Sequence, residues 1–196
     1  VAHAAGATDP VRDAGIVETE FLLADLDTVE RASRKAANVA KSGKVEDKER
    51  EALIHRVRES LEKGEQVNLV ELGERDRQTV RELGLLTAKP VLYVANTGED
   101  DPRGEGPHVA ALREAKGAER VIPVSVRIEE EISELPPEEQ VTFLMEMGLE
   151  ETALGLVVTA CYRLLDLITF YTIANEKLRA WSLRQGSTAS QAAGQV

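Results

Sequence analysis

The sequence has little of several residue types on which particular kinds of protein depend. Cys161 is the one cysteine among 196 residues, so no disulfide can form within the chain and a reducing cytoplasmic setting is expected. It lies in an apolar stretch, and we predict that it is a buried small residue. Aromatic residues make up only 4% and charged residues 30%, a balance that favours helices.

Other absences limit the partners that the chain can have. No apolar run approaches the roughly 18 residues that a membrane span needs, and residues 1–6 lack the charged and apolar regions of a secretory signal. The formal net charge is −11, which argues against broad electrostatic binding of DNA. His3, His55 and His108 are not at metal-ligand spacing, so no metal site is expected.

The first part of the sequence has the pattern of two helices. Asp9-Pro10 is typical of a helix start, and a heptad seam follows from residue 16. Ser42-Gly43 breaks this helix, and a second one, over residues 45–63, ends at Gly64. Because the connection is short, the two helices should be antiparallel. They could form a plain hairpin that packs on itself or an arm that contacts a large partner. The seam consists of Leu22, Leu26, Val29, Ser33, Ala36 and Ala40.

The middle of the sequence changes from helical periodicity to short apolar runs. A helix over residues 74–83 ends at Gly84, and strands are predicted at 91–95 and 121–125 with a helix over 109–116 between them. A βαβ unit has parallel strands, whose carboxyl ends lie on the same side of the sheet. We therefore expect Asn96, Thr97, Glu99 and Ser125 on one rim.

The last part of the sequence alternates between helix and strand patterns. Helices are predicted over 136–147 and 152–165, strands over 167–173 and 178–183, and a small-residue loop over 187–194. Trp181 should be buried, and residues 129–131 have the carboxylates that favour the first turn of their own helix.

The pattern Asn96-x-x-Glu99 at a strand end is a candidate reader of a nucleotide base. An Asn amide both donates and accepts hydrogen bonds, whereas an ionised carboxylate only accepts them. The alternative is an ordinary strand followed by a polar turn that Gly98 assists. The four-residue spacing by itself does not decide between them.

Several segments, in order along the chain, together resemble the YchF/Obg-like ATPase family, a branch of the P-loop GTPase superfamily. One of them, Leu85-Leu-Thr-Ala-Lys-Pro-Val-Leu-Tyr-Val-Ala-Asn96, closely resembles the strand that carries the family's base-recognition motif. The segments that carry the resemblance are 9–13, 20–30, 85–96, 125–131, 143–149, 167–172, 179–181 and 192–194.

The resemblance implies an α/β fold: a partial P-loop NTPase domain with a parallel sheet, an inserted antiparallel helical coiled-coil arm and the start of a β-grasp TGS domain. Its implied divisions are 1–15 for part of the nucleotide-binding domain, 16–84 for the arm, 85–174 for the remainder of the nucleotide-binding domain and 175–196 for the TGS domain. The chain is accordingly expected to be a piece, or the ordered part, of a longer protein.

The resemblance also implies a set of nucleotide-binding residues. Ordinary GTPases of this superfamily have Asn-Lys-x-Asp, whose Asp accepts from guanine; Glu99 is one methylene longer and implies a preference for ATP over GTP. Asn96 and Glu99 would contact the base, while Thr97, Ser125 and Val126 would line its pocket. The family usually has Ser-Ala where this chain has Ser125-Val126. Valine is bulkier than alanine, and this difference affects how the loop fits beside the base.

Two function classes, and a variant of the first, follow from the sequence. The first is a YchF-type ATPase that binds ATP with Mg²⁺ and associates with the ribosome, with the large subunit as the implied contact. The second is a non-enzymatic module that docks on RNA–protein surfaces through its arm and β-grasp region. A conventional GTPase is the third hypothesis, and Glu99 argues against it.

The 196 residues contain no Gly-x-x-x-x-Gly-Lys-[Ser/Thr] motif, which is the loop that cradles phosphates and supplies a magnesium-binding hydroxyl. Without that loop, the electrostatic stabilisation of phosphoryl transfer has no source. We therefore expect phosphate release from ATP and magnesium to be the same with the purified chain as with buffer alone. Release clearly above the buffer rate would contradict this prediction.

Overall fold

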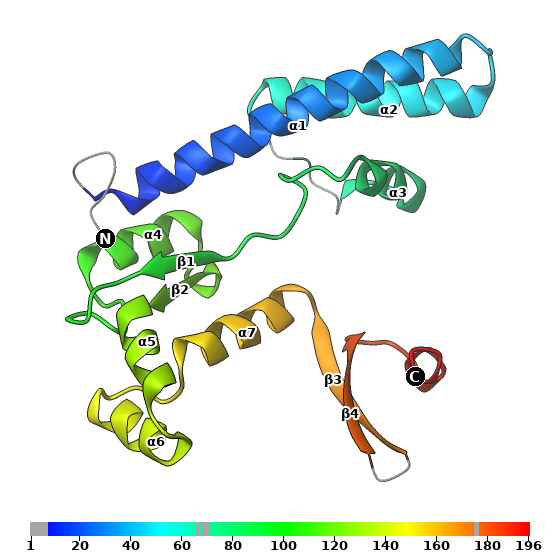
Figure 1. The fold of residues 1–196 in the computed structure, drawn as a ribbon. Helices are drawn as coiled ribbons and strands as arrows, with labels where there is room; N and C mark the ends of the chain where they lie inside the picture. Colours follow the sequence, from blue (N-terminus) through cyan, green and yellow to red (C-terminus); the bar gives the residue numbers. More distant parts are fainter. Residues whose placement is uncertain (1–7, 66, 68–70, 175–176) are drawn as a thin grey trace. The chain divides into compact units, whose positions relative to one another are not determined.

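The structure, a computed structural model, describes residues 8–65, 67, 71–174 and 177–196 (Figure 1). It consists of two compact units. One is Val11–Pro90; the other contains Val91–Val196 and the described residues before Val11. His3 lies outside the described residues, as does residue 175, at which the predicted TGS segment begins.

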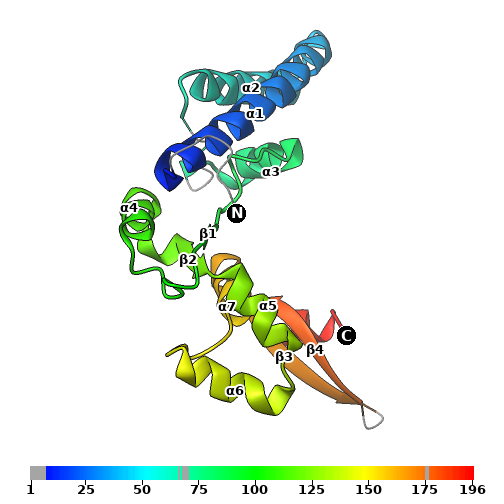
Figure 2. The same ribbon diagram turned by 60° about the vertical axis from the view of Figure 1, so that its left-hand side comes forward.

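The unit of residues 11–90 is helical. α1 (Pro10–Ala40) and α2 (Val45–Glu62) run side by side in opposite directions (Figure 1 and Figure 2), as predicted. The turn between them contains Gly43, whose φ of 81° is unfavourable for residues with a side chain. α3 (Glu74–Leu83) ends at Gly84, also as predicted. The buried core that joins the three helices consists of Val29, Ala36, Leu53, Ile54, Val57, Leu61, Val80 and Leu85.

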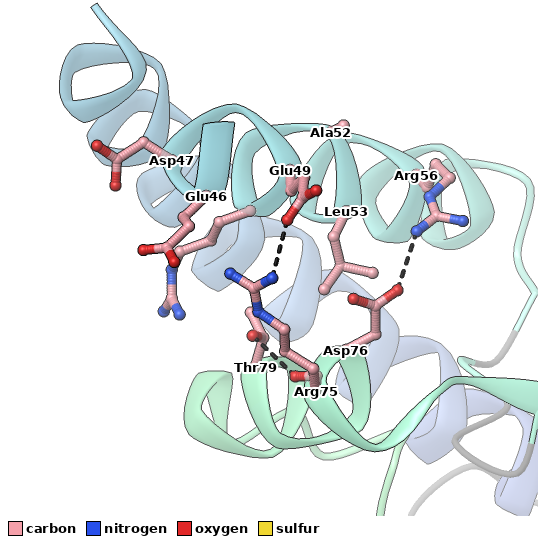
Figure 3. Close-up of a pocket in the computed structure, with 10 residues that line it drawn as sticks. Glu46, Asp47, Glu49, Ala52, Leu53, Arg56, Arg75, Asp76 and Thr79 are labelled. Atoms are coloured by element: carbon pink, nitrogen blue, oxygen red, sulfur yellow. Dashed lines mark hydrogen bonds and ion pairs between the residues drawn. The ribbon is translucent and has the colours of Figure 1, made fainter. Parts of the chain in front are cut away.

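A groove of about 560 Å³ lies between α2 and α3 (Figure 3). Its walls carry acidic and basic side chains in mixture, most of which pair with one another across the groove. Because these side chains are exposed, each pair contributes little to stability, and the apolar core beneath holds α3 in place. The pairs across the groove are Arg75–Glu49 at 2.9 Å and Arg56–Asp76 at 3.2 Å. Arg50, which also lines the groove, pairs at 3.1 Å with Glu82 of α3, outside the lining.

Asp25 is a buried acid that the sequence pattern did not reveal. Its side chain lies in α1, and the residue is only 2% exposed. One carboxylate oxygen accepts from Leu86 N at 2.8 Å, and the other accepts from Thr87 N and Thr87 Oγ1, each at 2.7 Å. Asp25 thereby ties α1 to the segment that follows α3, the last part of this unit before Val91.

The unit that contains residues 91–196 begins with the predicted βαβ arrangement. β1 (Tyr93–Asn96) and β2 (Val121–Val124) are parallel, and α4 (Pro107–Lys116) with the short 3₁₀ helix η2 (Ala118–Arg120) connects them. β1 starts two residues later than predicted and extends one residue further, to Asn96.

Three helices follow β2: α5 (Val126–Glu134), α6 (Pro137–Glu146) and α7 (Ala153–Leu164). The prediction that Glu129 serves the first turn of its own helix is incomplete. Its carboxylate accepts from Ala153 N at 2.7 Å and Leu154 N at 3.1 Å, so it also caps the start of α7. This contact joins α5 to α7.

The chain then forms an antiparallel hairpin of β3 (Leu167–Ala174) and β4 (Lys177–Arg184), and ends with α8 (Ala189–Ala193). Three predictions for residues 161–194 are wrong. Residues 187–194 are not a loop, because Thr188 and Gln191 form a capping box that begins α8. Trp181 is only partly buried, and its indole N–H donates to Thr172 Oγ1 at 2.9 Å. Cys161, on α7, is also only partly buried.

Within the described residues, no helix combines the length and the apolar character that a membrane span requires.

The buried carboxylate of Asp25 gives the first structural prediction. Asp25→Ala removes the acceptor of two backbone N–H groups and a hydroxyl, so we expect a loss of about 2–3 kcal/mol in the free energy of unfolding. Urea denaturation of the purified chain measures this change.

Asp27→Ala is the matched control, because Asp27 lies on the same helix with its side chain 64% exposed and pairs only with Arg31 there. We expect it to change the free energy of unfolding by no more than about 0.5 kcal/mol. Equal effects of the two substitutions would show that the Asp25 contacts do not stabilise the unit.

Candidate base-binding site

The carboxyl ends of β1 and β2 lie next to each other in the unit of residues 91–196 (Figure 1). The register pairs Asn96 with Val124, the last residues of the two strands. One residue further, Thr97 N donates to Val124 O at 2.9 Å. This pairing brings the segment after β1 to the segment where β2 passes into α5, which is where open α/β sheets bind ligands.

Asn96 connects these two segments through its side chain. Its Oδ1 accepts from Val126 N at 3.4 Å, at the first residue of α5. This contact takes up an otherwise unpaired N–H at the helix start and directs the amide toward α5. Asn96 is exposed, and its amide N–H groups are available as donors to a ligand.

Two buried hydroxyl groups lie at the same strand ends. Thr97 Oγ1 and Ser125 Oγ are buried, and neither has a hydrogen-bond partner within the described part of the chain. Ser125 as a whole is 4% exposed and is the N-cap residue of α5, but its side chain makes no cap hydrogen bond. A buried hydroxyl left unpaired costs about 1–3 kcal/mol, so this place favours a ligand or water that supplies the missing partners.

Glu99 reaches the same region by a different contact. Its Oε1 lies 2.7 Å from Arg127 Nε, and Arg127 also lies 3.9 Å from Glu131. Arg127 is the residue that the sequence analysis missed. Its position in the sequence could have indicated it: Arg127 lies two residues after Ser125, in the first turn of the helix that starts at the rim.

The loop between β1 and α4 contains a turn closed by Asp101 and a glycine that lies against β2. Asp101 accepts from Glu105 N at 2.7 Å and from Gly106 N at 3.0 Å. Gly104 has φ 62°, and a Cβ there would lie 2.5 Å from Pro123 Cβ. Only glycine allows the loop to approach β2 this closely.

An apolar pocket of about 770 Å³ adjoins the rim within this unit. Val126, one of the predicted site residues, lines it together with Val94 and Val124 from the strands and Leu154 from α7. Asn96, Thr97, Glu99 and Ser125 do not line it, so Val126 is the residue that the pocket and the rim share. A flat apolar ring could lie over this valine.

The structure thus brings four of the five predicted site residues together through Asn96 and the strand ends, and it brings Glu99 to the same helix start through Arg127. Among the described residues, no group of three His, Cys, Asp or Glu side chains is placed to hold a metal ion.

Comparison with known proteins gives consistent similarities. A family model described as "YchF-GTPase_C: Protein of unknown function (DUF933)" matches residues 167–196. "Ribosome-binding ATPase YchF" of Escherichia coli O157:H7 is 37% identical over 198 residues, covering 100% of this chain and 54% of that protein. The protein of the same name from Bacillus subtilis (strain 168) is 36% identical and covers 99% and 54%.

"Obg-like ATPase 1" of Saccharomyces cerevisiae is 32% identical, over 100% of this chain and 52% of that protein. Among solved structures, that of the Schizosaccharomyces pombe YchF GTPase superposes with a TM-score of 0.82 at 28% identity, over 99% of this chain and 54% of that one. The chain therefore spans about half the length of the relatives it matches.

Proposed function

The chain belongs to the YchF/Obg-like ATPase family, and we propose that its segment from β1 to the start of α5 binds the base of a nucleotide, with ATP preferred to GTP. The observation that carries this proposal is the set of groups at the strand ends. Asn96 Oδ1 contacts Val126 N, and the hydroxyls of Thr97 and Ser125 are buried without a partner within the described residues.

Each residue has a role that its chemistry permits. Asn96 donates to and accepts from the base edge, and Glu99 accepts from a base amino group. Thr97 and Ser125 supply hydroxyl or backbone groups beside the ring, and Val126 supplies an apolar surface against it. Glu99, being longer than an Asp, places its carboxylate differently from the Asp that accepts from guanine, which favours adenine.

The catalytic part of the proposal concerns a protein that contains a phosphate-binding loop in addition to these residues. Such a protein would hydrolyse ATP in the presence of Mg²⁺. The 196 residues contain no Gly-x-x-x-x-Gly-Lys-[Ser/Thr] loop, and the described part offers no cluster of three potential metal ligands. The contribution of this chain is therefore to bind and orient the base.

We extend the proposal to the other segments and to the partners. Residues 16–84 act as a coiled-coil arm and residues 175–196 as the start of a TGS domain. Relatives named as ribosome-binding support the ribosome as a partner. We propose that the contact is with the large subunit and that the protein acts in the cytoplasm. The mixed charge along α2 and α3 is compatible with docking on a surface of either sign, which keeps the non-enzymatic module as the second candidate.

The choice of base can be tested through Glu99. Glu99→Asp shortens the carboxylate by one methylene, and we expect the ratio of ATP to GTP affinity to fall by about threefold or more. The measurement is a pair of titrations of the chain, one with ATP and one with GTP. In both, the NMR shifts of the Thr97 and Ser125 amides report the binding.

Glu105→Asp is the matched control, because it makes the same change at another exposed position of the same loop. It should leave the ratio unchanged. An unaltered ratio in Glu99→Asp, with both nucleotides still binding, would count against the role of Glu99.

Ribosome association separates the two candidate functions. If the chain belongs to a nucleotide-dependent switch, we expect the fraction that sediments with ribosomes to change when ATP is added. Sedimentation of the purified chain with and without ribosomes and with and without ATP measures this fraction. Binding that ignores ATP supports the non-enzymatic module, and a chain that stays in the supernatant throughout contradicts the ribosome as a partner.

A further inference from the structure

We propose that Arg127 selects the base at this site: by holding one carboxylate oxygen of Glu99, it disfavours guanine relative to adenine. This inference rests on the proposed base-binding function and adds a specificity-determining residue to it. Neither the pattern Asn96-x-x-Glu99 nor the similarity to known relatives assigns a role to Arg127.

The geometry places the pair at the rim. Arg127 is the second residue of α5, directly after Val126, whose N–H contacts Asn96. Glu99 lies in the segment after β1, three residues beyond Asn96. Arg127 Nε lies 2.7 Å from Glu99 Oε1, so the two opposite charges form a close ion pair. The ion pair therefore joins the same two segments that the Asn96 contact joins.

The chemistry of the two bases explains how this pair discriminates. A free carboxylate offers two acceptor oxygens, which match the adjacent N1–H and 2-amino donors of guanine. Adenine instead presents one amino donor beside an acceptor nitrogen. With Oε1 engaged by Arg127, Glu99 offers Oε2 as an acceptor while the guanidinium offers donors beside it. This arrangement suits adenine and leaves one guanine donor without a partner, which costs affinity.

The exposure of the pair indicates that its role is not stability. The side chains of Arg127 and Glu99 are 72% and 49% exposed, and ion pairs with this exposure contribute little to folding. Glu131 also lies near the guanidinium, at 3.9 Å, so it is a weaker partner for Arg127 than Glu99 is. Replacing Arg127 should therefore leave the fold intact and change the availability of Glu99.

The test compares AMP with GMP, which carry the same phosphate. Arg127→Met frees both oxygens of Glu99, and we expect the ratio of AMP to GMP affinity to fall about fivefold, the scale of one hydrogen bond. The ratio is measured by titrating the 196-residue chain and following the NMR shifts of the Thr97 and Ser125 amides. Because the phosphates are identical, a general loss of positive charge weakens both nucleotides equally and leaves the ratio unchanged.

Two further variants serve as a control for lost charge and as a test that Arg127 acts through Glu99. Arg120→Met removes a charge from an arginine whose side chain is 53% exposed, in η2 of the same unit, and should leave the ratio unchanged. In a chain that already carries Glu99→Gln, adding Arg127→Met should have no further effect on the ratio, because Arg127 acts through the carboxylate.

The outcomes separate this inference from the function on which it rests. An unchanged ratio in Arg127→Met, or an equal weakening of AMP and GMP, overturns the role of Arg127 while leaving the base site in place. Absence of any nucleotide-dependent shift at Thr97 and Ser125 in the unaltered chain, or binding that persists undiminished in Asn96→Ala, overturns the base site itself and the inference with it.

Discussion

The parallel pairing of β1 with β2 is the constraint on which the candidate site depends. It sets Asn96 beside Val124 at the ends of both strands, so that the residues after each strand meet. Separate stretches of sequence, about 30 residues apart, thereby contribute to one rim (Asn96 accepts from Val126 N). Without this register the amide of Asn96 would have no helix start to contact, and the two hydroxyls would not lie at a common edge.

The site uses different kinds of contact for different purposes. The amide of Asn96 and the backbone of Thr97 are tied to the strand and helix ends, which gives the rim a defined shape. The hydroxyls of Thr97 and Ser125 are buried and keep hydrogen-bonding capacity that the described protein groups do not use. Glu99 is exposed and forms an ion pair with Arg127, so its position can be altered by replacing Arg127 without disturbing the scaffold.

The helical unit follows a similar division between scaffold and surface. Its core is apolar and joins three helices, and the buried carboxylate of Asp25 fixes the segment after α3 by three hydrogen bonds. The ion pairs of the α2–α3 groove lie on the outside, where solvent weakens them (Figure 3). A partner can therefore exchange contacts with this surface while the core remains unchanged.

The sequence by itself determined the two antiparallel helices, the turn at Gly43, the parallel strand pair and the position of Asn96 at a strand end, because periodicity and glycine act locally along the chain. Tertiary structure decided what local patterns cannot encode. Asp25 is a buried acceptor because residues 86 and 87 meet it, and Arg127 holds Glu99 because β1 and α5 meet at one edge. In both cases the partners are far apart in sequence, and only the packing of the fold brings their atoms within hydrogen-bond distance.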